Sequence, residues 1–324
     1  MPRRTQDWDS RIGRRVTLRD LHILSTVVRC GSMAKAASHL AMSQSAVSEG
    51  IAHLEDALRV RLLDRSARGI EPTIYANVLL KREHAVFDEL KQGIKDIEFL
   101  SDPNAGEVRL GCVEMMSYGV LPAVIDRFSC RHPQIAVRIL PLDTESLDFQ
   151  VLQERNVDFV IARTPTSYVN DDLDIEVFLN DSLVVIVGAQ SAWASRHKVA
   201  LSELVNEPWI LPPTPYVRAL MKEAFEAHGL QAPSERVTAA SIQLRIQLLE
   251  TGRFVSLLAD SVLQGNAERW SLKALPIDLR AKPPPWSIVK LKNRTVSPVV
   301  ELFINHLREV AKFRSLPPAN NRRR

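Results

Sequence analysis

The chain contains few of the residues that metal, redox or nucleophilic chemistry requires. Only three of its 324 residues are cysteine, Cys30, Cys112 and Cys130, and their positions show no paired spacing. The eight histidines are scattered, and the HExxH and CxxC spacings of zinc sites are absent. A phosphate loop, a dinucleotide fingerprint and a nucleophile elbow are also absent. The sequence therefore predicts a reduced chain with no metal or cofactor, and it disfavours an enzyme.

Long apolar runs are missing as well. No stretch approaches the roughly 20 residues that span a bilayer, and the arginine-rich N-terminus lacks the apolar segment of a signal peptide. These absences disfavour a membrane protein and a secreted solute-binding protein, so we expect a cytoplasmic chain. Cys112 has no basic neighbour in the sequence, which favours a small core residue over a redox-sensing thiol.

The net charge of +4 is concentrated near the N-terminus. Residues 1–75 hold 12 of the 42 Lys and Arg residues and 8 of the 38 Asp and Glu residues, which leaves 30 of each sign in the rest of the chain. Attraction to phosphates needs positive charge, so this distribution favours nucleic-acid binding by the first 75 residues. A charged run is more often only a solvated surface, and the excess supports rather than proves this interpretation.

Residues 32–54 have the pattern of two short helices that meet at a tight corner. Gly31 can end a preceding helix, and the hydroxyls of Ser32 and Ser43 can cap the two helices that follow. The apolar face of the second helix comprises Val47, Ile51, Leu54 and Leu58. The opposite face, short or polar, comprises Gln44, Ser45, Ser48, Glu49 and Ala52. This layout is typical of a helix-turn-helix whose second helix enters the DNA major groove, with an ordinary helical hairpin as the alternative.

Residues 59–73 predict a short hairpin with basic residues near its tip. Such a wing can place Arg65 and Arg68 on phosphates beside the groove. We expect the exposed start of the second helix to touch bases or phosphates. Glu49 there can accept a hydrogen bond from a cytosine amino group, because phosphates repel a carboxylate. The predicted DNA-binding residues are Ser32, Gln44, Ser45, Ser48, Glu49, Arg65 and Arg68.

The same residues resemble the N-terminal domain of LysR-type transcriptional regulators. The resemblance is carried, in order, by Leu18-Arg-Asp-Leu-His-Ile-Leu, Gly31-Ser-Met-Ala-Lys-Ala-Ala, Ser43-Gln-Ser-Ala-Val-Ser, Leu62-Leu63, Arg65, Arg68-Gly69 and Pro72-Thr73. Three positions depart from the family pattern: Ser45 replaces the usual Pro, Glu49 a common Arg or Lys, and Asn77 a frequent Gly. The resemblance implies a regulator that binds double-stranded operator DNA, contacts RNA polymerase and forms a homodimer or homotetramer.

Residues 73–100 predict one long helix. Its apolar positions alternate steps of four and three, which is typical of a coiled-coil seam with one polar interruption. The seam comprises Ala76, Leu80, Glu83, Phe87, Leu90, Ile94 and Ile97. So narrow a stripe indicates a contact between subunits, and the family resemblance implies that this helix pairs protomers. The alternative is that the helix packs on its own effector domain.

Residues 107–314 alternate short apolar runs with helical patterns, which predicts parallel sheets covered by helices. By resemblance they form two hinged lobes like those of a periplasmic binding protein, joined by crossing strands near 173–180 and 272–282. We therefore expect an α/β protein with a winged helix-turn-helix domain (16–74), a linker and dimerisation helix (75–101) and an effector-binding domain (107–314). Lobe 1 is predicted at 107–172 and 280–314, and lobe 2 at 173–279.

A small-molecule effector is expected between the lobes, where helix N-termini point inward. Met115 and Met116 can form an apolar wall, which favours an organic acid with a hydrophobic body over a very small diacid. In the family a hydroxyl residue is common at the position of Met115, and Ser117 can substitute for it. Thr144 and Thr214 are polar candidates because each lies at a strand-to-helix loop. Ordinary loop or core packing is the alternative for each. The segments expected to face the effector are 114–117, 143–146, 163–166, 212–216 and 240–242.

The sequence thus predicts a sequence-specific transcriptional regulator controlled by an effector. Two other classes remain open. An enzyme fused to a DNA-binding domain would need a catalytic set in the second half of the chain. An architectural DNA-binding protein without an effector would have a closed, solidly packed contact between the lobes.

Overall fold

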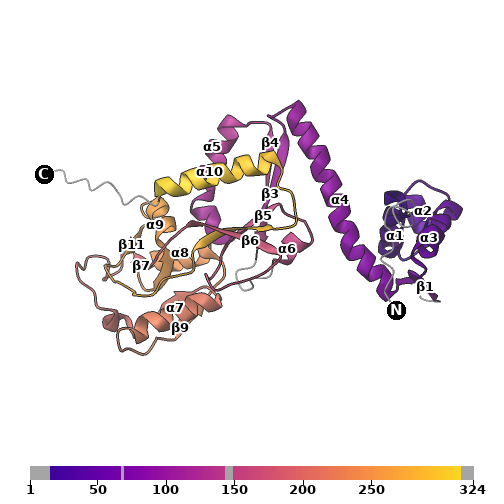
Figure 1. The fold of residues 1–324 in the computed structure, drawn as a ribbon. Coiled ribbons are helices and arrows are strands. Elements are labelled where there is room, and N and C mark those ends of the chain that lie inside the picture. Colours follow the sequence, from indigo (N-terminus) through magenta and orange to yellow (C-terminus); the bar gives the residue numbers. More distant parts are fainter. Residues whose placement is uncertain (1–14, 67–68, 143–148, 315–324) are drawn as a thin grey trace, which may run out of the picture. The chain divides into compact units, whose positions relative to one another are not determined.

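The computed structural model describes residues 15–66, 69–142 and 149–314 (Figure 1). The chain divides into two compact units, Met1–Lys91 and Gln92–Arg324. The boundary between the units falls within the long helix α4 (Ile74–Ser101).

The first unit is a small helical domain with a two-stranded sheet. It contains α1 (Leu18–Cys30), α2 (Met33–His39), α3 (Gln44–Leu58), β1 (Leu63–Ser66) and β2 (Gly69–Pro72). The helices approach closely where their residues are small. Ala36 is fully buried, and a Cβ on Gly50 of α3 would lie 2.7 Å from Cδ1 of Ile23 in α1. These small residues let the three helices pack around one core.

The helix ends follow the sequence signals with one exception. Gly31 ends α1 with a φ of 62°, the left-handed conformation that glycine adopts without strain. Ser43 caps α3, because its Oγ accepts a hydrogen bond from the Ala46 N–H at 3.1 Å. Ser32 occupies the cap position of α2, but its side chain makes no capping hydrogen bond. The prediction that its hydroxyl caps α2 is therefore wrong, although the helix begins where expected.

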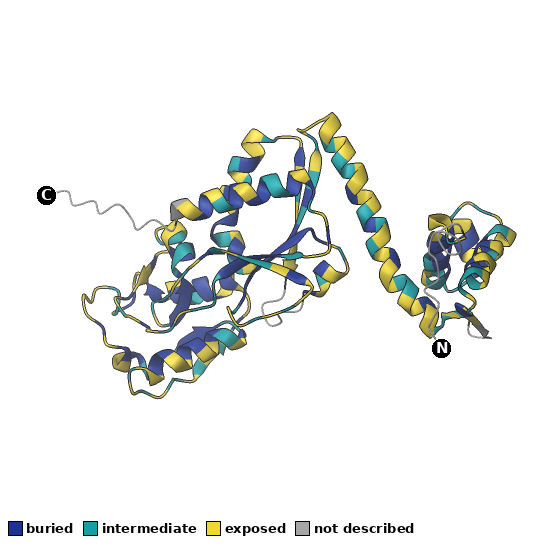
Figure 2. Cartoon of the chain, viewed as in Figure 1, coloured by how far each residue is buried: buried dark blue, intermediate teal, exposed yellow. Residues whose placement is uncertain are grey.

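Helix α4 confirms the long helix predicted at 73–100, and its apolar seam divides into two parts. Ala76, Leu80 and Phe87 pack against the core of the first unit. Leu90, Ile94 and Ile97 are 45%, 57% and 65% exposed, and Figure 2 shows exposed residues along α4. The second part of the seam is thus uncovered in the single chain.

The second unit contains two mixed five-stranded sheets, each the centre of a lobe. The sheet of lobe 1 has the order β4-β3-β5-β12-β6. Its strands are β3 (Gly106–Val113), β4 (Ile135–Leu142), β5 (Phe159–Arg163), β6 (Leu173–Leu179) and β12 (Trp286–Leu291). Its helical segments are η2 (Glu114–Tyr118), α5 (Leu121–Arg131), α6 (Gln150–Gln153) and α10 (Pro298–Arg314). Phe128 of α5 and Phe303 of α10 meet edge to face at 5.0 Å in the core of this lobe.

The sheet of lobe 2 has the order β11-β7-β10-β8-β9. Its strands are β7 (Leu183–Gly188), β8 (Trp209–Leu211), β9 (Glu235–Thr238), β10 (Val255–Ala259) and β11 (Leu272–Ala274). Its helices are η3 (Leu201–Leu204), α7 (Pro215–Glu226), α8 (Ile242–Glu250) and α9 (Asp260–Asn266). Strand residues alternate between a core that includes residues of α7 and one that includes residues of α8 and α9.

Two expectations about the lobes differ from the structure. The sheets are mixed rather than parallel, because β12 runs antiparallel to β5 and β6, and β7 runs antiparallel to β10. The predicted boundary at residue 173 also shifts, because β6 pairs with β12 and belongs to the sheet of lobe 1. The chain therefore enters lobe 2 after Leu179. Residues 143–148 lie outside the described residues, and the helix α6 that follows them covers only 150–153.

Candidate DNA interface and effector site

The predicted recognition face of α3 is available to a partner. Gln44, Ser45 and Glu49 are exposed and Ser48 is half-buried, whereas Val47 and Leu54 on the other side are fully buried. The Oγ atoms of Ser43 and Ser45 lie 2.9 Å apart, so the cap and the first turn share a hydrogen bond. The helix is thus fixed by its apolar face and presents short polar side chains at its N-terminal end.

The predicted wing is an antiparallel pair held against the helical core. Arg65 of β1 lies opposite Ile70 of β2, and Arg68 lies outside the described residues. The carboxylate of Glu55 in α3 accepts hydrogen bonds from the N–H groups of Leu62 at 2.7 Å and Leu63 at 3.3 Å. The Ile70 N–H donates to the Gly31 carbonyl at 3.3 Å, which joins β2 to the corner that carries half-buried Ser32.

In the second unit, a buried ion pair lies where the chain crosses between the lobes. Asp181, between β6 and β7, pairs with Arg163 at the end of β5 at 3.3 Å, and both side chains are at most 4% exposed. Asp181 also accepts hydrogen bonds from Oγ of Ser261 in α9 at 2.7 Å and from Nε1 of Trp286 at 3.3 Å. The Arg163 guanidinium donates to the Pro284 carbonyl at 2.7 Å and stacks on the Trp286 ring. This cluster links β5 of lobe 1, α9 of lobe 2 and the segment that leads into β12.

Tyr216, in the first turn of α7 in lobe 2, joins this cluster. Burial raises the pKa of its phenol, while the positive charges of Arg163 and Arg245 and a hydrogen bond with Arg163 lower it. Burial lowers the pKa of Arg163, and Tyr216 and Asp181 oppose that shift. The charges of arginines from both lobes, Arg163 and Arg245, therefore act on Tyr216.

A second arginine is buried near Tyr216. Arg245 of α8 is 4% exposed, and its Nε has no hydrogen-bond partner among the described residues. Burial lowers the pKa of its guanidinium, and the negative charge of Glu114 in lobe 1 and the nearby Tyr216 oppose the shift. The described residues therefore place a buried cation beside the contact between the lobes.

The predicted effector residues occupy different environments. Met115 is half-buried and packs against the cores of both lobes, whereas Met116 is 2% exposed inside the core of lobe 1. Ser117 is exposed on η2, Thr214 is buried at the cap position of α7, and Thr144 lies outside the described residues. Met115 thus comes together with α8, while Met116 serves the packing of lobe 1.

Sequence reasoning named the segments that contain Arg163 and Tyr216 but missed Asp181 and Arg245 as site residues. Asp181 lies in a short connection that has no periodic pattern. Arg245 left a signal that could have been used: it stands three residues after Ile242 and one before Ile246, inside the apolar stripe of a helix.

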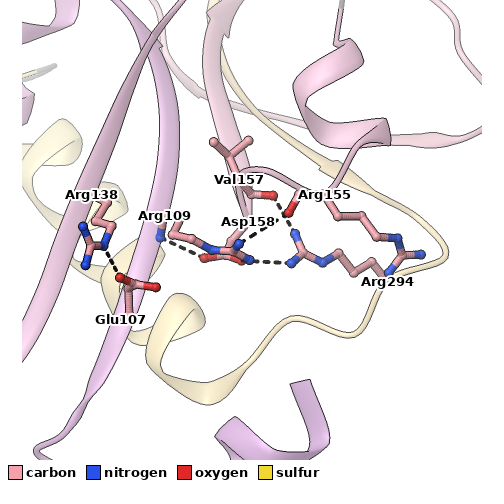
Figure 3. Close-up of polar contacts among 7 residues, drawn as sticks. All are labelled: Glu107, Arg109, Arg138, Arg155, Val157, Asp158 and Arg294. Carbon is pink, nitrogen blue, oxygen red and sulfur yellow. Dashed lines mark hydrogen bonds and ion pairs between the residues drawn. The ribbon is translucent and has the colours of Figure 1, made fainter. Parts of the chain in front are cut away.

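A further charged cluster holds lobe 1 together (Figure 3). The carboxylate of Asp158 accepts hydrogen bonds from Nη2 of Arg109 at 2.8 Å and from Nη2 of Arg294 at 3.0 Å. It also accepts from the Arg109 N–H at 2.8 Å, and Arg294 donates to the Val157 carbonyl at 2.6 Å. Glu107 and Arg138 form a separate pair across β3 and β4. The Asp158 cluster fastens the segment before α10 to β3 and β5, and it is structural.

Other kinds of site find little support in the part of the chain that the structure describes. No group of three or more His, Cys, Asp or Glu residues there is placed to hold a metal. No helix among those residues has both the length and the apolarity to cross a bilayer. Burial raises the pKa of the Cys112 thiol to about 11, so this thiol is protonated near neutral pH and unreactive.

Comparisons with known proteins match both parts of the chain. The model of the bacterial regulatory helix-turn-helix protein, lysR family, matches residues 18–76, and the LysR substrate binding domain matches residues 101–312. The HTH-type transcriptional regulator GbpR of Azospirillum brasilense is 23% identical over 296 residues, which are 91% of this chain and 86% of GbpR.

Solved structures show the same fold. Full-length CbnR complexed with its target DNA has a TM-score of 0.53 at 21% identity, and the match covers 91% of this chain and 100% of CbnR. A full-length OxyR variant from Pseudomonas aeruginosa has a TM-score of 0.63 at 17% identity, covering 92% and 97% of the two chains.

A winged helix-turn-helix joined by a long helix to a two-lobed α/β domain defines a DNA-binding transcriptional regulator with a C-terminal effector-binding domain. The chain belongs to the LysR family of these regulators. Regulators of this type bind DNA and small-molecule effectors and form oligomers. The enzyme interpretation is excluded, because the relatives are transcriptional regulators.

The buried pair at the lobe crossing should contribute strongly to stability. Replacing Asp181→Asn keeps the shape but leaves the Arg163 guanidinium buried without its counter-ion, so we expect the free energy of unfolding to fall by about 3 kcal/mol. Urea denaturation measures the change. Asp174→Asn is the matched control, because the exposed Asp174 carboxylate pairs with Lys290 at 3.4 Å, and its loss should cost less than about 1 kcal/mol. Equal effects of the two substitutions would contradict the role given to Asp181.

Proposed function

We propose that this chain recognises its operator through the N-terminal face of α3 and the wing, and that an organic acid bound between the lobes controls transcription. The observation that carries the first part is the division of α3, whose apolar side is buried while its first turn is exposed and polar. Such a helix can enter the major groove N-terminus first without disturbing its own core. The proposed DNA contacts are Ser32, Gln44, Ser45, Ser48, Glu49, Arg65 and Arg68.

These contacts have different roles in the proposal. Gln44, Ser45 and Ser48 meet bases or phosphates, and exposed Glu49 accepts from a cytosine amino group. Arg65 and Arg68 bind phosphates beside the groove and position the domain without reading sequence. The protein acts in the cytoplasm, where it meets operator DNA and RNA polymerase.

The recognition helix can be tested by adding negative charge to its exposed face. Ser45→Glu combined with Ser48→Glu should abolish operator binding, because two carboxylates would face phosphates and bases, while the fold is kept. Gel shift measures binding, and circular dichroism checks folding. The control is Gln134→Glu with Asn305→Glu, which adds the same charge at two exposed positions of lobe 1. Unchanged operator affinity in the α3 variant would remove this helix from the groove.

The uncovered part of the α4 seam supports a dimer contact. Leu90, Ile94 and Ile97 continue the heptad positions that pack against the core of the first unit, yet they are exposed in the single chain. A symmetric pairing would cover them and hold two DNA-binding domains for two half-sites. A homotetramer would combine two such dimers.

Lysine substitutions test this seam. Leu90→Lys with Ile94→Lys would place like charges against each other in a symmetric pair, so the variant should sediment as a smaller species. Its operator affinity should also fall, because two half-sites are no longer held together. Val169→Lys is the control, since Val169 is an apolar residue of lobe 1 that is 83% exposed. A double variant of unchanged size would place the interface elsewhere.

The second part of the proposal rests on the contact between the lobes. Met115 reaches both cores, and the amide nitrogen of Asn266 in α9 donates to the Tyr118 carbonyl of η2 at 2.8 Å. Arg245 is buried beside this contact without an acceptor for its Nε, and a group with no role would not be expected to carry this penalty. We therefore favour an effector site, with Met115, Met116, Ser117, Thr144 and Thr214 as its proposed residues.

A screen of organic acids tests the effector role. Acids that raise the melting temperature of the protein should also change operator occupancy, DNA bending or transcription, because a ligand shifts an equilibrium only through its different affinity for two states. Ser117→Ala should weaken the binding of these acids. Ser167→Ala, at another exposed serine of lobe 1, should leave binding unchanged. Acids that bind without any effect on these three readouts would refute the effector role.

A further inference from the structure

Arg245 is a charged residue inside the apolar face of a helix. The buried positions of α8 are Ile242, Arg245, Ile246 and Leu249, and the three aliphatic residues belong to one core cluster of lobe 2. The position of this helix is tightly fixed. A Cβ on Gly188 of β7 would lie only 2.1 Å from the Leu249 carbonyl oxygen, so the helix backbone rests directly on the strand. The fold therefore holds the Arg245 guanidinium in place rather than letting it swing into solvent.

This guanidinium lacks the partners that normally compensate a buried cation. Its Nε is buried without a hydrogen-bond partner, and the described residues provide no ion pair to it. Burying a charge without acceptors is unfavourable, and such groups are usually paired. Arg163 shows the compensated case: it has the Asp181 carboxylate, the Pro284 carbonyl and the Trp286 ring. Arg245 is thus the uncompensated member of the two arginines next to Tyr216.

The charge of Arg245 is not neutralised by the acidic residues nearest to it. Glu114, at the start of η2 in lobe 1, is the acid whose charge acts on Arg245, but it is exposed and forms no ion pair with it. Asp181 is already engaged by Arg163, Ser261 and Trp286. A single anionic group of a ligand would complete the charge balance that the protein leaves open.

Tyr216 provides a second polar group for such a ligand. A guanidinium only donates hydrogen bonds. The phenol of Tyr216, whose pKa is raised by burial, keeps its proton and can also donate it to an acceptor. A carboxylate has several acceptor positions and can take hydrogen bonds from Arg245 and Tyr216 together.

The neighbouring residues are apolar. Met115 and Tyr118 of η2 pack against the cluster that contains Ile242 and Ile246, the residues flanking Arg245 along the face of α8. Beyond its charged group, a ligand at this place would therefore meet thioether and aliphatic surface, which favours a hydrocarbon body. The second cation near Tyr216, Arg163, is already paired with Asp181.

We propose that Arg245 is the anion-binding residue of the site between the lobes, and that the site takes a monocarboxylate with an apolar body. This inference rests on the effector site proposed above and names its charge and its binding residue. Arg163 is a structural residue in this arrangement, and Tyr216 is the second hydrogen-bond donor to the carboxylate.

The test uses the full-length protein and three six-carbon probes: hexanoate, neutral hexanamide and the dianion hexanedioate. Calorimetric titration should detect hexanoate, with hexanamide at least tenfold weaker and hexanedioate weaker than hexanoate. Arg245→Gln should raise the Kd for hexanoate about ten- to hundredfold, the range expected for a lost hydrogen-bonded charge pair. Arg245→Lys should retain part of the affinity. Arg236→Gln, at an exposed arginine of β9, should bind as the wild type does.

Stability without ligand separates a binding role from a structural one. Removing an uncompensated buried charge should leave the melting temperature of Arg245→Gln unchanged or higher. A clearly lower melting temperature would make Arg245 a structural residue and overturn the proposal. Unchanged hexanoate affinity in Arg245→Gln would overturn it as well. So would a wild-type protein that binds none of the straight-chain acids from butanoate to octanoate, or prefers the dianion.

Operator binding, measured on the same samples, distinguishes this inference from the effector role. Hexanoate that binds through Arg245 without changing operator occupancy, DNA bending or transcription would support the site and count against the effector role. An acid that controls operator binding equally well in the wild type and in Arg245→Gln would preserve the effector role and refute the inference about Arg245.

Discussion

The buried ion pair of Arg163 and Asp181 is the constraint on which the arrangement of the second unit depends. It stands at the point where the chain passes between the lobes, and Ser261 and Trp286 complete its hydrogen bonds. An ion pair this deeply buried is kept only if its geometry and its remaining hydrogen bonds are good. The cluster therefore fixes the crossing between the lobes, while the proposed effector site lies elsewhere at their contact, where η2 meets α9.

The two arginines near Tyr216 differ in how their buried charges are compensated. Arg163 is saturated with partners, whereas Arg245 is buried with an open donor. Proteins tend to break local rules at functional sites and compensate elsewhere. Here the compensation is the apolar packing of α8, in which Ile242, Ile246 and Leu249 outweigh one unpaired charge. A bound carboxylate would remove that penalty, and this is a physical source of ligand-dependent stability.

Sequence signals within a few residues predicted the local structure. Features that depend on contacts between distant residues could not be predicted from the sequence. The helix-turn-helix, the wing and the extent of α4 follow from caps and periodicity within a few residues. The place of β6 does not, because it is decided by pairing with β12, more than 100 residues away. The prediction that the Ser32 hydroxyl caps α2 was wrong, because a serine at the start of a helix does not by itself determine where its hydroxyl bonds. Arg245 carried a signal, a charge in an apolar stripe, but its missing acceptor is visible only in three dimensions. The DNA and effector contacts remain predictions.

The apolar seam of helix α4 lies in two different environments. Ala76, Leu80 and Phe87 use the seam to complete the core of the first unit, and Leu90, Ile94 and Ile97 repeat it where the single chain offers no cover. Because a continuous helix fixes the rotation between successive turns, both parts of the seam lie on one side of α4. The exposed apolar residues are unfavourable in a monomer, so pairing through this face would couple the stability of the chain to its oligomeric state.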